Sequence, residues 1–364
     1  IQILTADKQI NLINVGNQTL GFWNADGTAS ASQLGGGSGT WSVVSPVWTD
    51  ESGSLTAPMQ PQPGFAIFGG NAGTVTINNS AGSVQATGMQ FASDGYRMTG
   101  DALTLIADAD HPAPVEIRVG DGSASSGSYV TSIDNVITGS DGLNKTGAGT
   151  LVLNGSNLYS GGTTLSAGRL SVSSDANLGA VNGGLTFAGG VLELGSSFDL
   201  ATARSVQLTA AGGTIDTNGF NSTLRREITG NGDLIKAGAG TLTLNGMNSF
   251  TGKTRIDAGG TLALAGQGRI NSSSGVEVNG TLDISAAAAA QIKTLSGNGS
   301  VVLGSNYLTI AQAAGVFSGA VTGTGGVMVT GGSQVLSGNS SFSGTLGISE
   351  GATVRIGDGG SAGS

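Results

Sequence analysis

The sequence predicts an all-β fold, a right-handed parallel β-helix in which each rung is made of three short strands. Composition is the first reason: glycine supplies 66 of the 364 residues, whereas only 10% of the residues are charged. The apolar residues are mainly Leu, Val and Ile, and with Thr they form strands that Gly, Asn, Ser and Asp can join by turns. The second reason is the shortness of the alternating apolar runs, and the third is an internal repeat.

The first part of the chain differs from the rest in composition. All three tryptophans, Trp23, Trp41 and Trp48, fall in one early window. We therefore expect residues 1–70 to form an N-terminal cap or aromatic-rich first rungs with a Pro-rich loop, and residues 71–364 to form the repeat-containing β-helix. The tryptophans have two interpretations: a hydrophobic cap that shields the first rung, or an exposed aromatic contact site for a sugar or a protein. In the second interpretation all three are candidate ligand-binding residues.

The internal repeat has two close copies. Residues 142–170 read GLNKTGAGTLVLNGSNLYSGGTTLSAGRL, and residues 232–262 read GDLIKAGAGTLTLNGMNSFTGKTRIDAGGTL. A third, more divergent copy extends over residues 325–354 and lacks the lysine of the other two. Repetition of a strand-rich unit is typical of solenoids, in which each unit buries its apolar face against the next.

Short strands at this density also suit an antiparallel sandwich or barrel. We favour the solenoid because the strands are shorter than most sandwich strands and the spacing between matched units is long and irregular, with roughly 20–25 residues per rung. Side chains in a strand alternate between its two faces. Leu151, Leu153, Leu242 and Leu244 should therefore point into the core, and Thr243 should point outward.

Charge and cysteine content exclude several kinds of partner. The net charge is −9 and the pI about 4.4, so we expect no nucleic-acid partner, because phosphate backbones would be repelled. The chain has no cysteine, which excludes disulfides, thiolate metal sites and cysteine nucleophiles. We expect no cofactor.

No catalytic constellation is visible in the sequence. His111 is the single histidine, and no nucleophile motif accompanies it, so a serine-protease triad is not expected. The carboxylates near it, Asp108, Asp110 and Glu116, lack the spacing of a calcium loop, and the acidic residues elsewhere are too scattered for a glycosidase pair. We predict that the chain is not an enzyme and has no metal site.

Four side chains at matched positions of the two close copies are assigned structural roles and no ligand-binding role. Lys145 and Lys236 are interpreted as strand-edge residues. Tyr159 and Phe250 are interpreted as packing residues of the repeat.

The repeat pattern, Lys-x-Gly-x-Gly-x-Leu-x-Leu-Asn-Gly followed by an aromatic residue and Gly-x-Thr, resembles the passenger-associated transport repeat of autotransporters. The resemblance covers roughly residues 64–356. It implies a right-handed β-helix within a precursor that also carries a signal peptide and a C-terminal outer-membrane barrel. The barrel is absent from this chain, so we expect a passenger fragment that is displayed at the bacterial surface and meets the membrane only through that barrel.

Adhesion, autoaggregation and biofilm formation are the functions that the resemblance implies. The expected partner is a host-cell surface protein or glycan, or a second copy of the same passenger. The alternative is a structural stalk in an autotransporter whose protease or lipase domain lies outside this sequence.

Overall fold

The structure, a computed structural model, describes residues 2–4, 9–11, 19–28 and 35–357. Regular structure in these ranges is almost wholly β-strand, apart from two short 3-10 helices, η1 (Ala124–Ser128) and η2 (Asp175–Leu178). The chain divides into two compact units, residues 1–170 with 176–183, and residues 171–175 with 184–364. Strand β18 (Arg169–Val172) lies where the chain passes from the first unit to the second.

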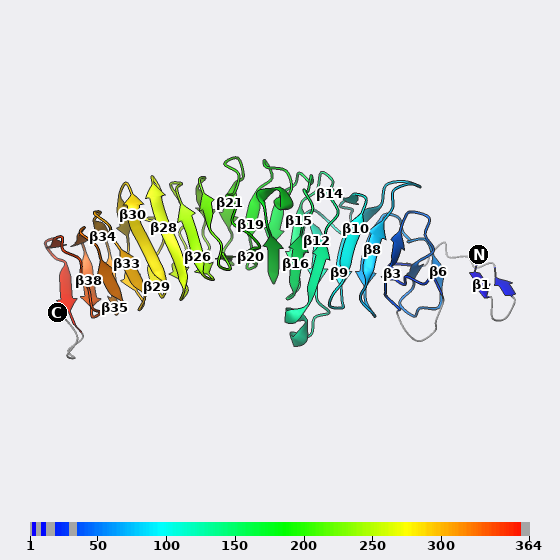
Figure 1. Cartoon of the computed structure of the whole chain (residues 1–364), viewed down its shortest axis with the longest axis horizontal. Coiled ribbons are helices and arrows are strands. Elements are labelled where there is room, and N and C mark those ends of the chain that lie inside the picture. The colour runs from blue at the N-terminus through cyan, green and yellow to red at the C-terminus, as the bar shows by residue number, and fades with distance from the viewer. Residues whose placement is uncertain (1, 5–8, 12–18, 29–34, 358–364) are drawn as a thin grey trace. The chain divides into compact units, whose positions relative to one another are not determined.

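The first unit consists mainly of parallel strands in two sheets, and Figure 1 shows these strands in blue to green. One sheet has the order β16-β13-β10-β8-β4, with β4 (Gly39–Trp41), β8 (Thr74–Ile77), β10 (Arg97–Gly100), β13 (Val130–Ile133) and β16 (Thr150–Leu153). The other has the order β17-β15-β12-β9-β7-β3-β5-β6, with β3 (Phe22–Trp23), β5 (Trp48–Thr49), β6 (Thr56–Ala57), β7 (Gly64–Phe68), β9 (Gln85–Phe91), β12 (Val115–Val119), β15 (Leu143–Thr146) and β17 (Thr163–Leu165).

Smaller pairings complete the first unit. Strand β11 (Leu103–Leu105) pairs with β9 and with β14 (Ile137–Thr138), and both pairs are parallel. The pairs β3–β5 and β5–β6 are antiparallel, as is the separate pair β1 (Gln2–Leu4) and β2 (Gln9–Asn11). Strands β7 and β9 pair across the position where the sequence suggested a domain boundary, and the division at residue 70 stays a prediction.

The second unit is built wholly of parallel strand pairs among the described residues, and Figure 1 shows it in green to red. One sheet contains β20 (Val191–Leu194), β22 (Gly213–Asp216), β25 (Leu234–Ala237), β27 (Thr254–Ile256), β29 (Val276–Val278) and β32 (Leu295–Ser296). A second contains β23 (Ser222–Leu224), β26 (Gly240–Leu244), β28 (Gly260–Gly266), β30 (Thr281–Ala287), β33 (Ser300–Val302) and β36 (Ala320–Thr322).

Three further sets of strands belong to the second unit. They are β19 (Leu185–Phe187), β21 (Val206–Leu208) and β24 (Ile228–Gly230); β31 (Ala290–Ile292), β34 (Leu308–Ile310), β37 (Val327–Val329) and β39 (Leu346–Ile348); and β35 (Ala313–Phe317), β38 (Gly332–Leu336) and β40 (Thr353–Ile356). Gly297 directly follows β32, and Phe317 is the last residue of β35. A parallel bridge between them links the last set of strands to the sheet in which β32 is the last strand.

Several rungs of the second unit carry three strands, one on each face. Strands β29, β30 and β31 form one rung, and β32, β33 and β34 stack on them in the same order. Leu242 pairs in register with Leu262, and Leu262 pairs with Leu282, so these rungs are 20 residues long. The predicted all-β solenoid of parallel stacked strands, with three strands in a rung, is therefore confirmed.

The inward-facing leucines predicted from the repeat are also confirmed. Leu151, Leu153, Leu242 and Leu244 are each 0% exposed, whereas Thr243 is only half-buried. The alternation arises because successive strand side chains point to opposite faces of the sheet. The core is therefore a stack of aliphatic side chains from successive rungs.

One glycine in the repeat shows why the corners need this residue. Gly240, at the start of β26, has a φ of +87°, which residues with a side chain rarely adopt. A Cβ at this position would also lie 2.0 Å from the carbonyl oxygen of Phe220 on the rung before it. Both the backbone conformation and the close stacking of rungs therefore require glycine here.

The repeat copies of the second unit occupy different corners of the rung. The copy at residues 232–262 alternates between the sheet of β25 and β27 and the sheet of β26 and β28. The copy at residues 325–354 alternates between the sheet of β37 and β39 and the sheet of β38 and β40. Each copy of the repeat therefore spans two successive rungs. In each rung it contains one corner and the two strands that flank that corner.

Candidate functional site

The three tryptophans lie together inside the first unit. Trp23, Trp41 and Trp48 come from β3, β4 and β5, and all are 0% exposed. The ring centroids of Trp41 and Trp48 are 4.9 Å apart, and those of Trp23 and Trp48 are 5.3 Å apart, both in edge-to-face geometry. Phe68 packs against all three rings. This tryptophan cluster is thus a packed aromatic core.

Burial of the tryptophan cluster differs from the expectation of an exposed contact site. The indole N–H of Trp23 donates to the carbonyl oxygen of Gly37 at 2.9 Å, and that of Trp48 is buried without a partner among the described residues. Edge-to-face packing and area burial favour contacts between the rings over contact with water. The three rings are buried in this structure, and their ligand-binding role stays a prediction. The alternative, a cap on the first rung, stays a prediction.

The repeat lysines point inward and do not lie at a strand edge. Lys145 occupies an inward position of β15, is 0% exposed, and its Nζ donates to the carbonyl oxygens of Thr146, Gly147 and Ala167 at 2.7, 2.9 and 3.2 Å. Lys236 repeats the arrangement on β25, donating to the carbonyl oxygens of Ala237 and Gly238, each at 2.8 Å. The turn after each strand thus supplies the acceptors that a buried ammonium group needs.

The neighbours of these lysines give them different pKa values. Burial, together with the nearby positive charge of Arg118, lowers the pKa of Lys145 from 10.5 to about 7. Burial also lowers the pKa of Lys236, to about 8, but the carboxylates of Asp216 and Asp257 oppose that effect. The same repeat position is therefore easier to deprotonate in the first copy than in the second.

Lys145→Met is expected to remove a pH dependence of stability. The pKa of Lys145 is about 7 in the folded chain and near 10.5 when unfolded, so the unfolded state binds more protons between these values. Stability should therefore rise with pH across that window, by up to about 1.4 kcal/mol per pH unit, and should lose this slope in the variant. Urea unfolding of both proteins at about pH 6 and pH 9 measures the difference.

Lys236→Met is the matched comparison, because its window begins about one pH unit higher. Equal pH slopes in the wild type and in Lys145→Met would show that Lys145 keeps its proton in both folded and unfolded chains.

Two buried asparagines of the repeat were not singled out from the sequence. Asn157 accepts from the backbone N–H of Ile137 at 2.8 Å and donates to the carbonyl oxygen of Asn177 at 2.7 Å, so it joins three rungs. Asn248 does the same in the second copy, accepting from Ile228 at 2.8 Å. Their signal was their identical position in the two copies. Tyr159 and Phe250 are buried, which confirms them as packing residues.

The surroundings of His111 correspond to a surface loop. Its Nδ1 lies 3.1 Å from an oxygen of Asp108, and its ring stacks on Phe65 with centroids 5.3 Å apart. Glu116 instead accepts a hydrogen bond from Thr146. Within the described ranges, no group of three or more His, Cys, Asp or Glu residues is placed to hold a metal ion. A helix with the length and hydropathy to cross a membrane is likewise not found among them.

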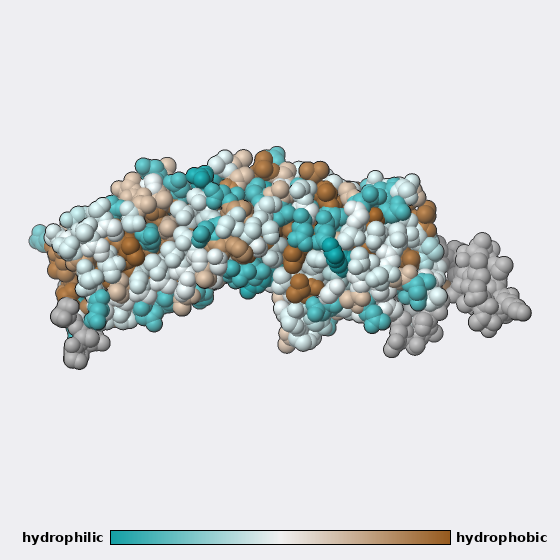
Figure 2. Space-filling view, in the orientation of Figure 1, coloured by the Kyte–Doolittle hydropathy of each residue, from teal (hydrophilic) through white to brown (hydrophobic). Residues whose placement is uncertain are grey.

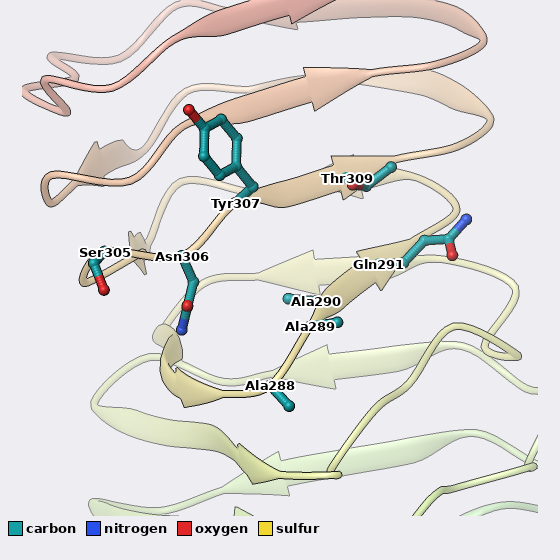
Figure 3. A pocket seen from close by; sticks show the side chains of 8 residues that line it. All are labelled: Ala288, Ala289, Ala290, Gln291, Ser305, Asn306, Tyr307 and Thr309. Atoms are coloured by element: carbon teal, nitrogen blue, oxygen red, sulfur yellow. The ribbon is translucent and has the colours of Figure 1, made fainter.

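The surface of the second unit has a hollow large enough to hold a small ligand. Its volume is about 390 Å³, and it opens between β31 and β34 (Figure 3). Eight residues line it: Ala288, Ala289, Ala290, Gln291, Ser305, Asn306, Tyr307 and Thr309. Elsewhere, Figure 2 shows a face on which hydrophobic residues are scattered among hydrophilic and near-neutral ones. We name the feature at β31 and β34 the Tyr307 hollow.

Comparison with known proteins adds three findings. The passenger-associated-transport-repeat family model matches residues 143–172, 234–264 and 331–356. A protein of Brucella suis biovar 1 (strain 1330) named adhesin BmaC autotransporter is 43% identical to this chain over 206 residues, which cover 56% of this chain and 6% of that protein. No solved structure matches the chain.

The matched residues confirm both close copies of the repeat and the third, divergent copy. The chain spans only a small part of the relative that it matches. Together with the parallel solenoid, these findings show that the chain carries passenger-associated transport repeats and that more than half of it is similar to part of an autotransporter protein.

Proposed function

We propose that this passenger segment takes part in adhesion at the bacterial surface, by binding a host-cell protein or glycan or a second copy of itself. One observation carries the proposal: the 43% identity over 206 residues to a protein named as an adhesin autotransporter. The aligned stretch covers more than half of this chain.

The fold supports a binding role because it presents outward side chains in columns. Stacked rungs bring outward residues from successive turns into register, as for Thr243, Ala263 and Asp283 on β26, β28 and β30, which are 20 positions apart. Neighbouring outward residues also pair across rungs, as Lys253 and Glu277 do. Such a surface offers many side chains from a rigid scaffold, which a partner can contact without any catalytic group.

Adherence conferred on a non-adherent bacterium tests this function. The full precursor is displayed on such a strain, beside the same precursor without residues 184–356, and both are brought to equal surface amounts. We expect the full precursor to raise host-cell binding or clumping several-fold, and the shortened one to lose most of that gain. Equal adherence of both strains, or no gain in either, would contradict the proposal.

The alternative role as a stalk makes a different prediction. A stalk would only hold an enzymatic domain that lies elsewhere in the precursor. Replacement of this segment by another solenoid of equal length should then leave the adherence of the displayed precursor unchanged. Loss of adherence after such a replacement favours the binding role.

A further inference from the structure

We propose that the Tyr307 hollow is a binding subsite for a neutral saccharide. This inference rests on the proposed role in adhesion and goes beyond it by naming the ligand class and the residues that contact it. The hollow lies wholly within the second unit, on the face formed by β31 and β34.

The hollow exists because two adjacent rungs carry unusual residues at the same place. Residues 286–290 are five consecutive alanines, and Ala288 and Ala289 are exposed, so the lower rung leaves space where larger side chains would fill it. The next rung supplies Tyr307, whose side chain is 50% exposed just before β34. Figure 3 shows Tyr307 and Gln291 at opposite ends of the lining, with the Tyr307 ring directed toward the following rung.

Contacts from neighbouring rungs hold both walls in place. The Asn306 side-chain amide donates to the carbonyl oxygens of Ile284, Ser285 and Ala287 at 2.8–3.0 Å, which fixes the lower wall. Tyr307 lies over Gly326 of the following rung, where a Cβ would stand 2.4 Å from Cε1 of the ring. The tyrosine ring is thus seated on a glycine, and the hollow is formed before any ligand arrives.

The polar groups of the hollow are neutral, and those of Gln291 and Tyr307 are available. Gln291 and Thr309 are register partners on β31 and β34, and both side chains face outward. Within the part of the chain that the structure describes, neither Gln291 nor Tyr307 makes a side-chain hydrogen bond to another residue. The lining therefore offers an amide and hydroxyl groups as both donors and acceptors, beside one half-exposed aromatic ring.

This combination fits a sugar better than other small ligands. The C–H faces of a sugar ring pack on an aromatic ring, and its hydroxyls exchange hydrogen bonds with amides and hydroxyls. None of the eight lining residues is charged, so an anion finds no cation and a metal ion finds no carboxylate. A net charge of −9 further disfavours sulfated or sialylated chains.

A peptide would not find its usual backbone partners here. Peptides that add to a sheet need a free strand edge. Strand β31 pairs with β34, and β34 pairs with β37, so the backbone groups around the hollow are already used in the sheet. The volume of about 390 Å³ falls in the range of about 300–1,000 Å³ that is usual for small-ligand sites.

Binding of defined saccharides by the purified chain tests the inference. The probes are lactose, N-acetyllactosamine, chitobiose and mannobiose on beads, with heparin and sialyllactose as anionic comparisons. We expect at least one neutral probe to retain the wild type, because multivalent display compensates for a shallow site. Tyr307→Ala should weaken that binding by about tenfold, and Tyr307→Phe, which keeps the ring, by no more than about twofold.

A filling variant and a surface control sharpen the result. Ala289→Trp should occupy the hollow and abolish binding while leaving Tyr307 in place. Val316→Ala, at a half-exposed position of β35 outside the lining, should bind as the wild type does. Circular dichroism and urea unfolding of each variant establish that the fold is intact.

Three outcomes overturn the inference: no neutral probe binds, Tyr307→Ala and Ala289→Trp bind as well as the wild type, or heparin is preferred through Tyr307. The displayed precursor separates this inference from the proposed function. If it adheres and neither variant changes saccharide binding or adherence, the hollow is not the site but adhesion stands. If saccharide binding follows the variants while the wild type fails to adhere, adhesion fails and the subsite stands.

Discussion

Leu242→Ala is expected to lower the free energy of unfolding around β26 by about 2–5 kcal/mol, the usual cost of truncating a buried leucine. Leu242 is 0% exposed and stacks in register between Ser222 on one rung and Leu262 on the next. Because rungs in a solenoid are stabilised mainly by their neighbours, the damage should stay local. Limited proteolysis should cut the variant within residues 220–270 while it leaves distant rungs intact.

Thr243→Ala is the control for this experiment. Thr243 is half-buried on the opposite face of the same strand, so its truncation should change stability by no more than about 0.5 kcal/mol. Similar destabilisation from both substitutions would mean that the two faces of β26 are energetically alike, against the assignment of core and surface.

Trp41→Ala is expected to be as damaging in the first unit, with a cost of about 3–5 kcal/mol. The Trp41 ring is 0% exposed, lies 4.9 Å from Trp48 and 6.0 Å from Phe68 between ring centroids, and its strand β4 pairs with β8. Its removal leaves a large cavity beside the buried rings of Trp48 and Phe68. Urea unfolding followed by tryptophan fluorescence should show an early transition in the variant.

The same substitution separates a packing role from a binding role. If Trp41 only packs, Trp41→Phe should recover most of the lost stability, and saccharide binding at the Tyr307 hollow should be unaffected by either change. A variant of normal stability that lost binding to a partner would instead support the contact-site interpretation of the tryptophans.

Alternation along strands made the core leucines predictable from the sequence, but it gave no reason to place a lysine inside. Lys145 and Leu143 occupy inward positions of the same strand. The alternation of inward and outward residues along β15 is regular only if the lysine is assigned to the buried face. The acceptors of its ammonium group are backbone carbonyls of the turn and of the next rung. Because these are backbone groups, no residue type in the sequence indicates them. The interpretation of Lys145 and Lys236 as strand-edge residues was therefore wrong, because both side chains point into the core.

Contacts between rungs also explain why the Tyr307 hollow was not predicted. Ala289 and Tyr307 are distant in sequence, and neither a short run of alanines nor a single tyrosine has a pattern that indicates a site. The tryptophans show the opposite problem, since their composition was noticeable but did not reveal whether their rings face the core or the solvent.

The corner position of the repeat has a consequence for how the passenger meets its surroundings. Since the copies at residues 232–262 and 325–354 use different corners of the rung, the side chains that they present outward leave the solenoid in different directions. A partner with a single flat surface would face one copy at a time, so repetition here does not multiply its contacts. Duplication instead increases the number of directions from which a partner can reach a corner built from the repeat.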